Sequence, residues 1–373
     1  MVKLYTLLLL SLTSAVVFAA PTTPVAESEP LRLVQTGDDK EPFWTTEKQR
    51  LDLILKNVGF MDITDHQEVS AFAAPAKKPL PKVVSHQDKF ALYVGQISTA
   101  NMKTALTTFS SFNNRYYKSP TGVESAKWLE KQVSDLIAGA GGKSESNVRR
   151  VSHSFSQFSI VARFEGLNAT LKNSPIVIGA HQDSINARSP TTGRSPGADD
   201  DGSGSIGILE VFRALINVGF RPARPVEFHW YAGEEAGLLG SQDIAKSYSS
   251  SAVDVLAMYQ NDMTAYAGTK FAEHFAVVTD YVDAELTALL RLYAKTYGNI
   301  AVRDTRCGYG CSDHASWNKY GYRSAFAIEA DMSDTNPYIH TANDDLSLIN
   351  YEHMKQFAKL ALGFAVELGN YLG

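Results

Sequence analysis

The chain has little cysteine and no excess of basic residues. Each shortage excludes a class of fold or of binding partner. Its 373 residues include only two cysteines, which excludes a fold held by several disulfides. Lysine and arginine total 35 against 40 acidic residues, giving a formal net charge of −5 with no basic cluster. Because nucleic acids are bound through basic surfaces, we expect no nucleic-acid partner. The absence of Gly-x-Ser-x-Gly and His-Glu-x-x-His motifs also disfavours a serine hydrolase and a single-helix zinc protease.

Long apolar runs are absent except at the start of the chain. Lys3 gives a short positive region, Leu4–Phe18 is apolar, and Ala19 and Ala20 are small residues suited to cleavage. This pattern predicts a signal peptide over residues 1–19, and therefore a secreted, extracellular protein. The run is too short and too rich in hydroxyl side chains for a membrane anchor, so we expect no membrane association.

The composition of residues 20–78 indicates a propeptide. Residues Lys48–Phe60 have the spacing of an amphipathic helix, and Ala71–Pro81 form a Pro/Ala/Lys linker of the kind that proteases cut. Cleavage near Lys78 would leave a body of residues 79–373, the size of one large domain. We expect the body to interact with its own propeptide and to be a monomer. The alternative is an N-terminal subdomain that is never removed.

The two cysteines and one sequon agree with export. Cys307 and Cys311 are more consistent with a small disulfide than with a zinc site, which would need more thiolates or histidines nearby. Asn168 begins the only Asn-x-Thr sequon that we identify and is a candidate glycosylation site.

Helix and strand patterns alternate along the body. This alternation predicts an α/β fold, with a mostly parallel central sheet flanked by helices on both faces. The expected strands are Ser159–Phe164, Ile176–Ala180, Val226–Tyr231, Val255–Gln260, Phe275–Thr279 and Ser324–Glu329. The expected helices are Met102–Phe112, Val123–Ile137, Ser203–Val218, Asp283–Tyr297 and Tyr351–Leu372.

Metal-binding side chains follow several of the expected strands. Taken singly, an acidic turn is usually a solvated loop or a helix N-cap, and paired glutamates are usually surface charge. Together they gather at strand ends, where open α/β sheets place their chemistry. Histidine nitrogens and carboxylate oxygens suit zinc, and a carboxylate can bridge two ions. The candidates are His181, Asp183, Asp199, Asp200, Asp201, Glu234, Glu235 and Asp262.

Two further histidines compete to complete such a site. His314 lies in the segment that contains Cys311, and His340 lies in an Asn/Asp-rich segment. Their spacing from the other candidates does not choose between them.

Six motifs together resemble the secreted bacterial and fungal leucine aminopeptidases, which are co-catalytic di-zinc enzymes of the zinc-exopeptidase fold. The motifs are HQDS at 181–184, PGADDDGSG at 196–204, YAGEEAGLLGSQ at 231–242, QNDM at 260–263, CGYGCSDHASW at 307–317 and NPYIHTANDD at 336–345. The segments MDITD at 61–65 and FNNRYYKS at 112–119 resemble the fungal members.

The resemblance implies a role for each site residue. Two zinc ions per subunit are expected, one held by His181 and Asp262, the other by Glu235 and His340, with Asp200 as the bridge. Glu234 is expected to act as the general base and Asp183 to orient His181. Tyr309 is expected to stabilise the tetrahedral intermediate, and His314 to be structural.

This chemistry predicts removal of the N-terminal residue from peptides with a free N-terminus. A water bridging two zinc ions has a lowered pKa, and Glu234 can take its proton as it attacks the carbonyl. Because the substrate amine titrates at about 7.7–8.0, we expect faster turnover at mildly alkaline pH. A preference for Leu, Phe or Met is expected from an apolar hollow lined by Met263, Phe326, Ile328, Met332 and Ile339.

Two other functions use the same fold. A glutaminyl-cyclase-like acyltransferase would need one zinc ion, and a non-catalytic binding module would be expected to lack metal ligands. All five ligand positions are present in this sequence.

Overall fold

The computed structural model describes residues 30–37, 39–67 and 76–373. The expected signal peptide and residues 71–75 of the expected linker lie outside these ranges. Residues Leu31–Gly373 form one compact unit. The predicted processing site near Lys78 stays a prediction, and in the structure the Lys78 ammonium pairs with Asp254.

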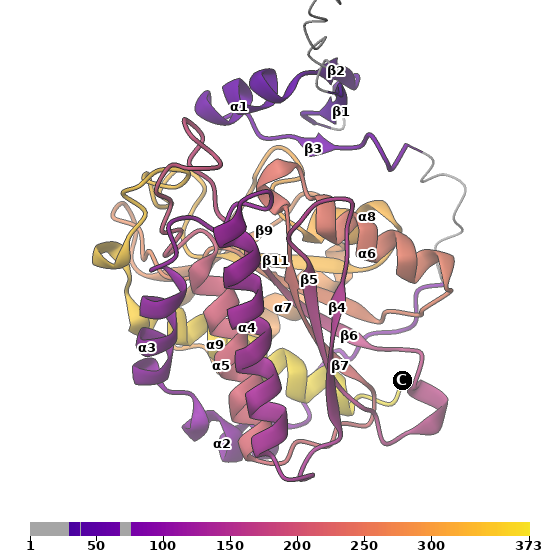
Figure 1. The fold of residues 1–373 in the computed structure, drawn as a ribbon. Helices are drawn as coiled ribbons and strands as arrows, with labels where there is room; N and C mark the ends of the chain where they lie inside the picture. Colours follow the sequence, from indigo (N-terminus) through magenta and orange to yellow (C-terminus); the bar gives the residue numbers. More distant parts are fainter. Residues whose placement is uncertain (1–29, 38, 68–75) are drawn as a thin grey trace, which may run out of the picture. The chain divides into compact units, whose positions relative to one another are not determined.

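An eight-stranded mixed sheet forms the centre of the body, as the sequence predicts (Figure 1). Its order is β10-β9-β11-β8-β6-β7-β5-β4, and the run β11-β8-β6-β7 is parallel. The central strands are buried along their whole length; β6 is almost entirely apolar, whereas β7 and β8 also bury polar side chains such as Glu227, His229 and Gln260. The strands are β4 (Ser146–Val151), β5 (Ser159–Phe164), β6 (Ile176–His181), β7 (Val226–Tyr231), β8 (Ala257–Asn261), β9 (His274–Val278), β10 (Ala301–Thr305) and β11 (Ser324–Ile328).

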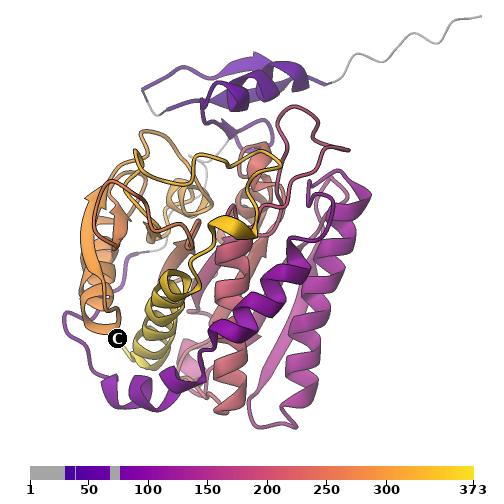
Figure 2. The same cartoon turned by 90° about the vertical axis from the view of Figure 1, so that its left-hand side faces the viewer.

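Helices cover both faces of this sheet (Figure 2). The larger core lies under α3, α4, α5, α7 and α9, and the smaller one, around Trp317, lies under α6 and α8. The helices are α2 (Gln87–Tyr93), α3 (Thr99–Phe109), α4 (Pro120–Gly139), α5 (Gly202–Asn217), α6 (Leu239–Ser250), α7 (Ala284–Tyr297), α8 (His314–Lys319) and α9 (Tyr351–Asn370). Among the described helices, none has the length and apolar character needed to cross a membrane.

The N-terminal segment, residues 31–67, has its own small sheet, which the sequence did not predict. Strands β1 (Arg32–Gln35), β2 (Phe43–Thr45) and β3 (Met61–Asp62) pair in the order β2-β1-β3. Helix α1 (Glu47–Leu55) begins with a capping box between Thr46 and Gln49.

The predicted helix Lys48–Phe60 is too long by five residues. The structure ends it at Leu55 because Asn57 adopts a left-handed φ of 54°, which breaks the helix. Residues Val58–Phe60 then lead directly into β3.

Candidate active site

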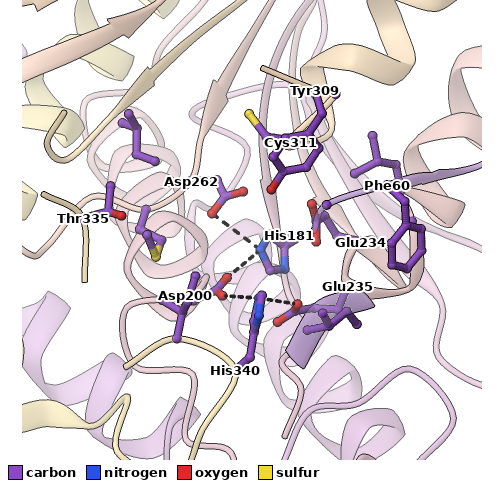
Figure 3. Close-up of a pocket in the computed structure, with 18 of the residues that line it drawn as sticks. Phe60, His181, Asp200, Glu234, Glu235, Asp262, Tyr309, Cys311, Thr335 and His340 are labelled. Atoms are coloured by element: carbon purple, nitrogen blue, oxygen red, sulfur yellow. Dashed lines mark ion pairs between the residues drawn. The ribbon is translucent and has the colours of Figure 1, made fainter. Parts of the chain in front are cut away.

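Three neighbouring parallel strands bring the candidate side chains together. Strand β6 ends at His181, which pairs with Tyr231 at the end of β7, and β8 ends one residue before Asp262. The turn after β7 carries Glu234 and Glu235. The carboxyl ends of adjacent parallel strands meet at one edge, so these groups surround one cavity (Figure 3).

Asp200 lies between the two histidines of this cavity. Its Oδ1 is 3.1 Å from His181 Nε2, and its Oδ2 is 3.2 Å from His340 Nε2. Asp262 Oδ1 lies 3.6 Å from His181 Nε2, and Glu235 Oε2 lies 2.9 Å from His340 Nε2. The structure therefore places all five expected ligands together, with one carboxylate shared by two groups.

The acidic loop, residues 199–201, is held by hydrogen bonds that fix the position of Asp200. The backbone N–H groups of Asp199 and Asp200 donate to the Asp344 carboxylate at 3.1 and 3.0 Å. Asp201 caps helix α5 by accepting from the Gly204 N–H, and it also accepts from the His181 N–H. The Asp199 carboxylate accepts from the Ala265 N–H and from Asn336, so the side chains of Asp199 and Asp201 have structural roles and Asp200 faces the cavity.

Asp183 supports the site mainly through the backbone. Its carboxylate accepts hydrogen bonds from the N–H groups of Glu234 and Glu235 at 3.1 and 3.2 Å. Its Oδ1 also lies 3.5 Å from His181 Nδ1, a contact longer than an ordinary hydrogen bond. The expected orienting role is compatible with this position, and the contact with the glutamate turn was not predicted.

Burial and the charges of neighbouring residues shift the pKa values of the ionisable groups in the site. Burial and the charge of Asp200 raise the pKa of Glu235 to about 7. Burial also raises the pKa of Glu234 well above its usual range, against the attraction of His181. Burial lowers the pKa of His181, but the charges of Asp262 and Glu234 more than offset this and raise it. A cluster of this kind is stabilised by added positive charge.

The donor set fits two divalent cations. One group contains His181, Asp200 and Asp262, and the other contains Asp200, Glu235 and His340, with the ligand atoms of each within 4.8 Å. Glu235 Oε1 is buried and has no hydrogen-bond partner within the described residues, so it is free to coordinate. Imidazole nitrogen with carboxylate oxygen is a zinc-type donor set.

His314 takes no part in this cluster. Its ring is fully buried, contacts Phe326 with 4.8 Å between centroids, and has no hydrogen bond to any described residue. Burial lowers its pKa to about 3, so the ring is neutral. The structure therefore selects His340, which the spacing alone did not.

Tyr309 and the residues of the expected apolar hollow line the same cavity. Tyr309 lies between Cys307 and Cys311, which form the expected disulfide. Burial and nearby carboxylates raise the pKa of the Tyr309 hydroxyl, so it stays protonated. The expected hollow residues line the same cavity, joined by Thr335, and are Met263, Phe326, Ile328, Met332 and Ile339.

Two kinds of contact were missed by sequence reasoning. Ser312 donates to Asp262 Oδ2 at 2.5 Å, and the motif CGYGCSDHASW contains this serine without indicating its partner. Ile54, Gly59 and Phe60 of the N-terminal segment also line the cavity, and Phe60 is labelled in Figure 3. No local pattern in the sequence predicts that second contact.

Comparisons with known proteins agree with this geometry. The model of Peptidase family M28 matches residues 159–365. Leucine aminopeptidase 1 of Arthroderma gypseum is 42% identical over 98% of this chain and 99% of its own length. Leucine aminopeptidase 1 of Emericella nidulans is 41% identical over 96% and 99% of the two chains.

Solved structures show the same fold. The LapA aminopeptidase of Legionella pneumophila superposes with a TM-score of 0.82 at 32% identity, covering 93% of this chain and all of that one. A glutaminyl cyclase of Porphyromonas gingivalis superposes with a TM-score of 0.58 at 16% identity, covering 73% of this chain and 99% of that one. The second likeness concerns the fold alone.

Proposed function

Because the chain belongs to Peptidase family M28, we propose that it is a zinc-dependent leucine aminopeptidase, which hydrolyses the first peptide bond of substrates with a free N-terminus. The relatives named leucine aminopeptidase 1 support the activity. The observation that carries the proposal is the position of Asp200, whose two oxygens face His181 and His340.

Two zinc ions are the proposed cofactors. His181 and Asp262 would hold one, Glu235 and His340 the other, and Asp200 would bridge them. When bound, the pair supplies a water of lowered pKa and a Lewis acid for the scissile carbonyl. The protein contributes the buried, prearranged carboxylates, which cost little reorganisation when the ions bind.

Glu234 is the proposed general base. It lines the cavity, follows strand β7, and is held through its backbone by Asp183 rather than through its own carboxylate. Bound cations would lower the raised pKa of its carboxyl, and the ionised side chain can then accept the proton of the attacking water and pass it to the departing amine. Tyr309, protonated and on the same cavity, can donate a hydrogen bond to the oxygen that gains negative charge.

The acidic lining explains a requirement for a free amine. The cavity contains Asp200, Glu234, Glu235 and Asp262, and among the described residues no lysine or arginine lines it. A neutral N-terminal amine has a lone pair for a zinc ion and two N–H donors for these carboxylates, whereas an acetylated terminus has a delocalised lone pair and keeps one N–H. The neighbouring apolar hollow fits a Leu-like first side chain, with Phe and Met as further candidates.

A cyclase using one ion is less well supported. The likeness to a glutaminyl cyclase is confined to the fold, and the described residues form two candidate metal groups rather than one. Failure to cyclise an N-terminal glutamine, together with hydrolysis of Leu-amide, would separate the two activities.

We also propose that the protein is secreted and that residues 20–78 form a propeptide that covers the site. Contacts between the N-terminal segment and the turn after β7 support the proposal that the propeptide covers the site. Arg50 donates to the Ala236 carbonyl at 3.0 Å, and Phe60, only 6% exposed, lines the cavity. Sequencing the N-terminus of the protein from culture medium would test both export and processing near Lys78.

Hydrolysis of Leu-amide and of N-acetyl-Leu-amide by the processed protein tests the proposed activity. We expect rapid release of leucine from the first and almost none from the second. Equal rates on both substrates would contradict an aminopeptidase.

A further inference from the structure

We propose that the groove covered by residues 60–62 of the N-terminal segment is the binding site for the substrate chain beyond the cleaved bond. In this groove the Gly237 carbonyl and the Gln242 side chain would hold the backbone of an extended peptide. The inference rests on the proposed function and names its substrate class as peptides of several residues rather than single amino-acid derivatives.

The direction of the covering segment agrees with that of a substrate. Gly59 and Phe60 line the cavity that contains the five expected ligands. The next residue, Met61, does not line that cavity; it packs with Ala315, which also lies outside it, and with Leu238, which lines it. The segment therefore runs from the cavity outward in the N-to-C direction. A peptide whose N-terminus lies at the carboxylates must leave the site with the same polarity.

The body holds this segment by its backbone. The Asp62 N–H donates to the Gly237 carbonyl at 3.0 Å, and Gln242 Nε2 donates to the Asp62 carbonyl at 2.9 Å. The Asp62 side chain points instead to Arg32 and Arg50 within the N-terminal segment. Both bonds to the body use groups that every peptide has, so any sequence without proline at that position can make them.

The groove side of these bonds is prearranged. Gln242 lies on α6, is fully buried, and also donates to the Gly237 carbonyl at 3.0 Å, which fixes the orientation of its amide. Gly237 has a φ of 100°, and a Cβ at this position would lie 2.5 Å from the Asp62 nitrogen. Glycine thus permits both the turn and the close approach of a second backbone.

The apolar side of the groove offers a place for a side chain. Leu238 and Ala315 are both at most 2% exposed in the structure, where Met61 packs with them. Removal of the N-terminal segment would uncover this surface next to the cavity. An apolar substrate residue could bury the same surface, so its position should favour Met, Leu or Ile over Asp.

The test compares substrates of different length. The full-length chain is folded first, then cut in the linker and freed of its N-terminal segment. We expect kcat/KM for the pentapeptide Leu-Ala-Ala-Ala-Ala to exceed that for Leu-amide by about tenfold or more, because two hydrogen bonds are added. N-methylation at successive positions of the pentapeptide should lower kcat/KM by roughly 3- to 10-fold at one position after the cleaved bond, where the N–H would meet Gly237.

A substitution distinguishes the contribution of this groove to kcat/KM from that of the metal-binding cluster. Gln242→Leu should lower the ratio of pentapeptide to Leu-amide kcat/KM by about 3- to 10-fold. Gln132→Leu is the matched control, because Gln132 lies on α4, outside the cavity, and the ratio should stay as in the wild type. Should Gln242→Leu fail to fold, the N-methyl series on the wild type decides alone.

The outcomes distinguish this inference from the proposed function. If Leu-amide is hydrolysed but length and N-methylation have no effect, the groove is only a docking surface for the N-terminal segment, and the inference is wrong. If Leu-amide itself is not hydrolysed, the proposed function fails and the inference fails with it.

Discussion

Replacing Gly59 by alanine should uncover the active site of the full-length chain. A Cβ built on Gly59 would lie 1.8 Å from Tyr309 Cε2 and 2.0 Å from Tyr309 Cζ. Non-bonded carbons pack at about 3.5–4.0 Å, so the segment or the ring has to move by roughly 2 Å. Gly59 does not have a positive φ, so the alanine backbone itself is tolerated.

The expected shift toward open sites follows from the contacts that the displacement would break. Full burial of a side chain such as Phe60 contributes about 1.5–3 kcal/mol. If the displacement removes that burial alone, the balance between covered and open sites shifts roughly 10- to 150-fold. Loss of the two hydrogen bonds at Asp62 would add about 1 kcal/mol each.

The assay is Leu-amide hydrolysis by uncut protein. We expect uncut Gly59→Ala to be at least about tenfold faster than uncut wild type. After trimming, the two should have the same kcat/KM because residue 59 is gone. Gly95→Ala is the control, because a Cβ at that position meets nothing within 4 Å. Uncut wild type as active as the trimmed enzyme, or uncut Gly59→Ala as slow as uncut wild type, would contradict this prediction.

Three other predictions concern the site and its support. His340→Gln should cost the protein one bound zinc ion while His314→Gln retains both, as measured by metal analysis; the reverse result would contradict the ligand assignment. Activity on Leu-amide should rise from pH 6 to pH 8 as the substrate amine, of pKa about 7.7–8.0, loses its proton, and a maximum near pH 5 would oppose this. Although burial raises the pKa of Glu227, its hydrogen bond with His229 and the charge of Arg163 lower it to about 2. Because the folded value lies below the unfolded one, Glu227 stabilises the fold above about pH 4.5 and loses this effect as the pH falls toward 2. Glu227→Gln should therefore reduce the free energy of unfolding by about 3 kcal/mol at pH 7 and by roughly half of that or less at pH 3 in urea titrations, and a reduction independent of pH would contradict the assignment.

The sequence predicts the buried centre of the fold well and its margins poorly. Strands β6 and β7 are buried along their whole length; β6 is almost entirely apolar, β7 also contains Glu227 and His229, which hydrogen-bond to each other, and the site residues lie at or just after the strand ends. Strand β4 lies at the sheet edge and reads SNVRRV, with polar side chains exposed to water, so its pattern is weak. Helix α6 was missed because its serine-rich sequence has only a weak apolar face.

From local sequence patterns, only those site residues that lie near strand ends could be predicted. His181 and Glu235 follow apolar runs, which marks them without any tertiary information. His340 lies in a loop with a φ of 59°, and only the folded chain brings it within 3.2 Å of Asp200. The contact of Gly59 and Phe60 with the cavity depends on docking of a separate segment, which no local periodicity encodes.

The shared position of Asp200 is tested most directly by counting metal ions in the trimmed protein and following activity during their removal. The account predicts two zinc ions per chain, loss of Leu-amide hydrolysis on exhaustive chelation, and recovery when zinc is returned. A protein that holds no metal, or that hydrolyses Leu-amide undiminished after chelation, would contradict it.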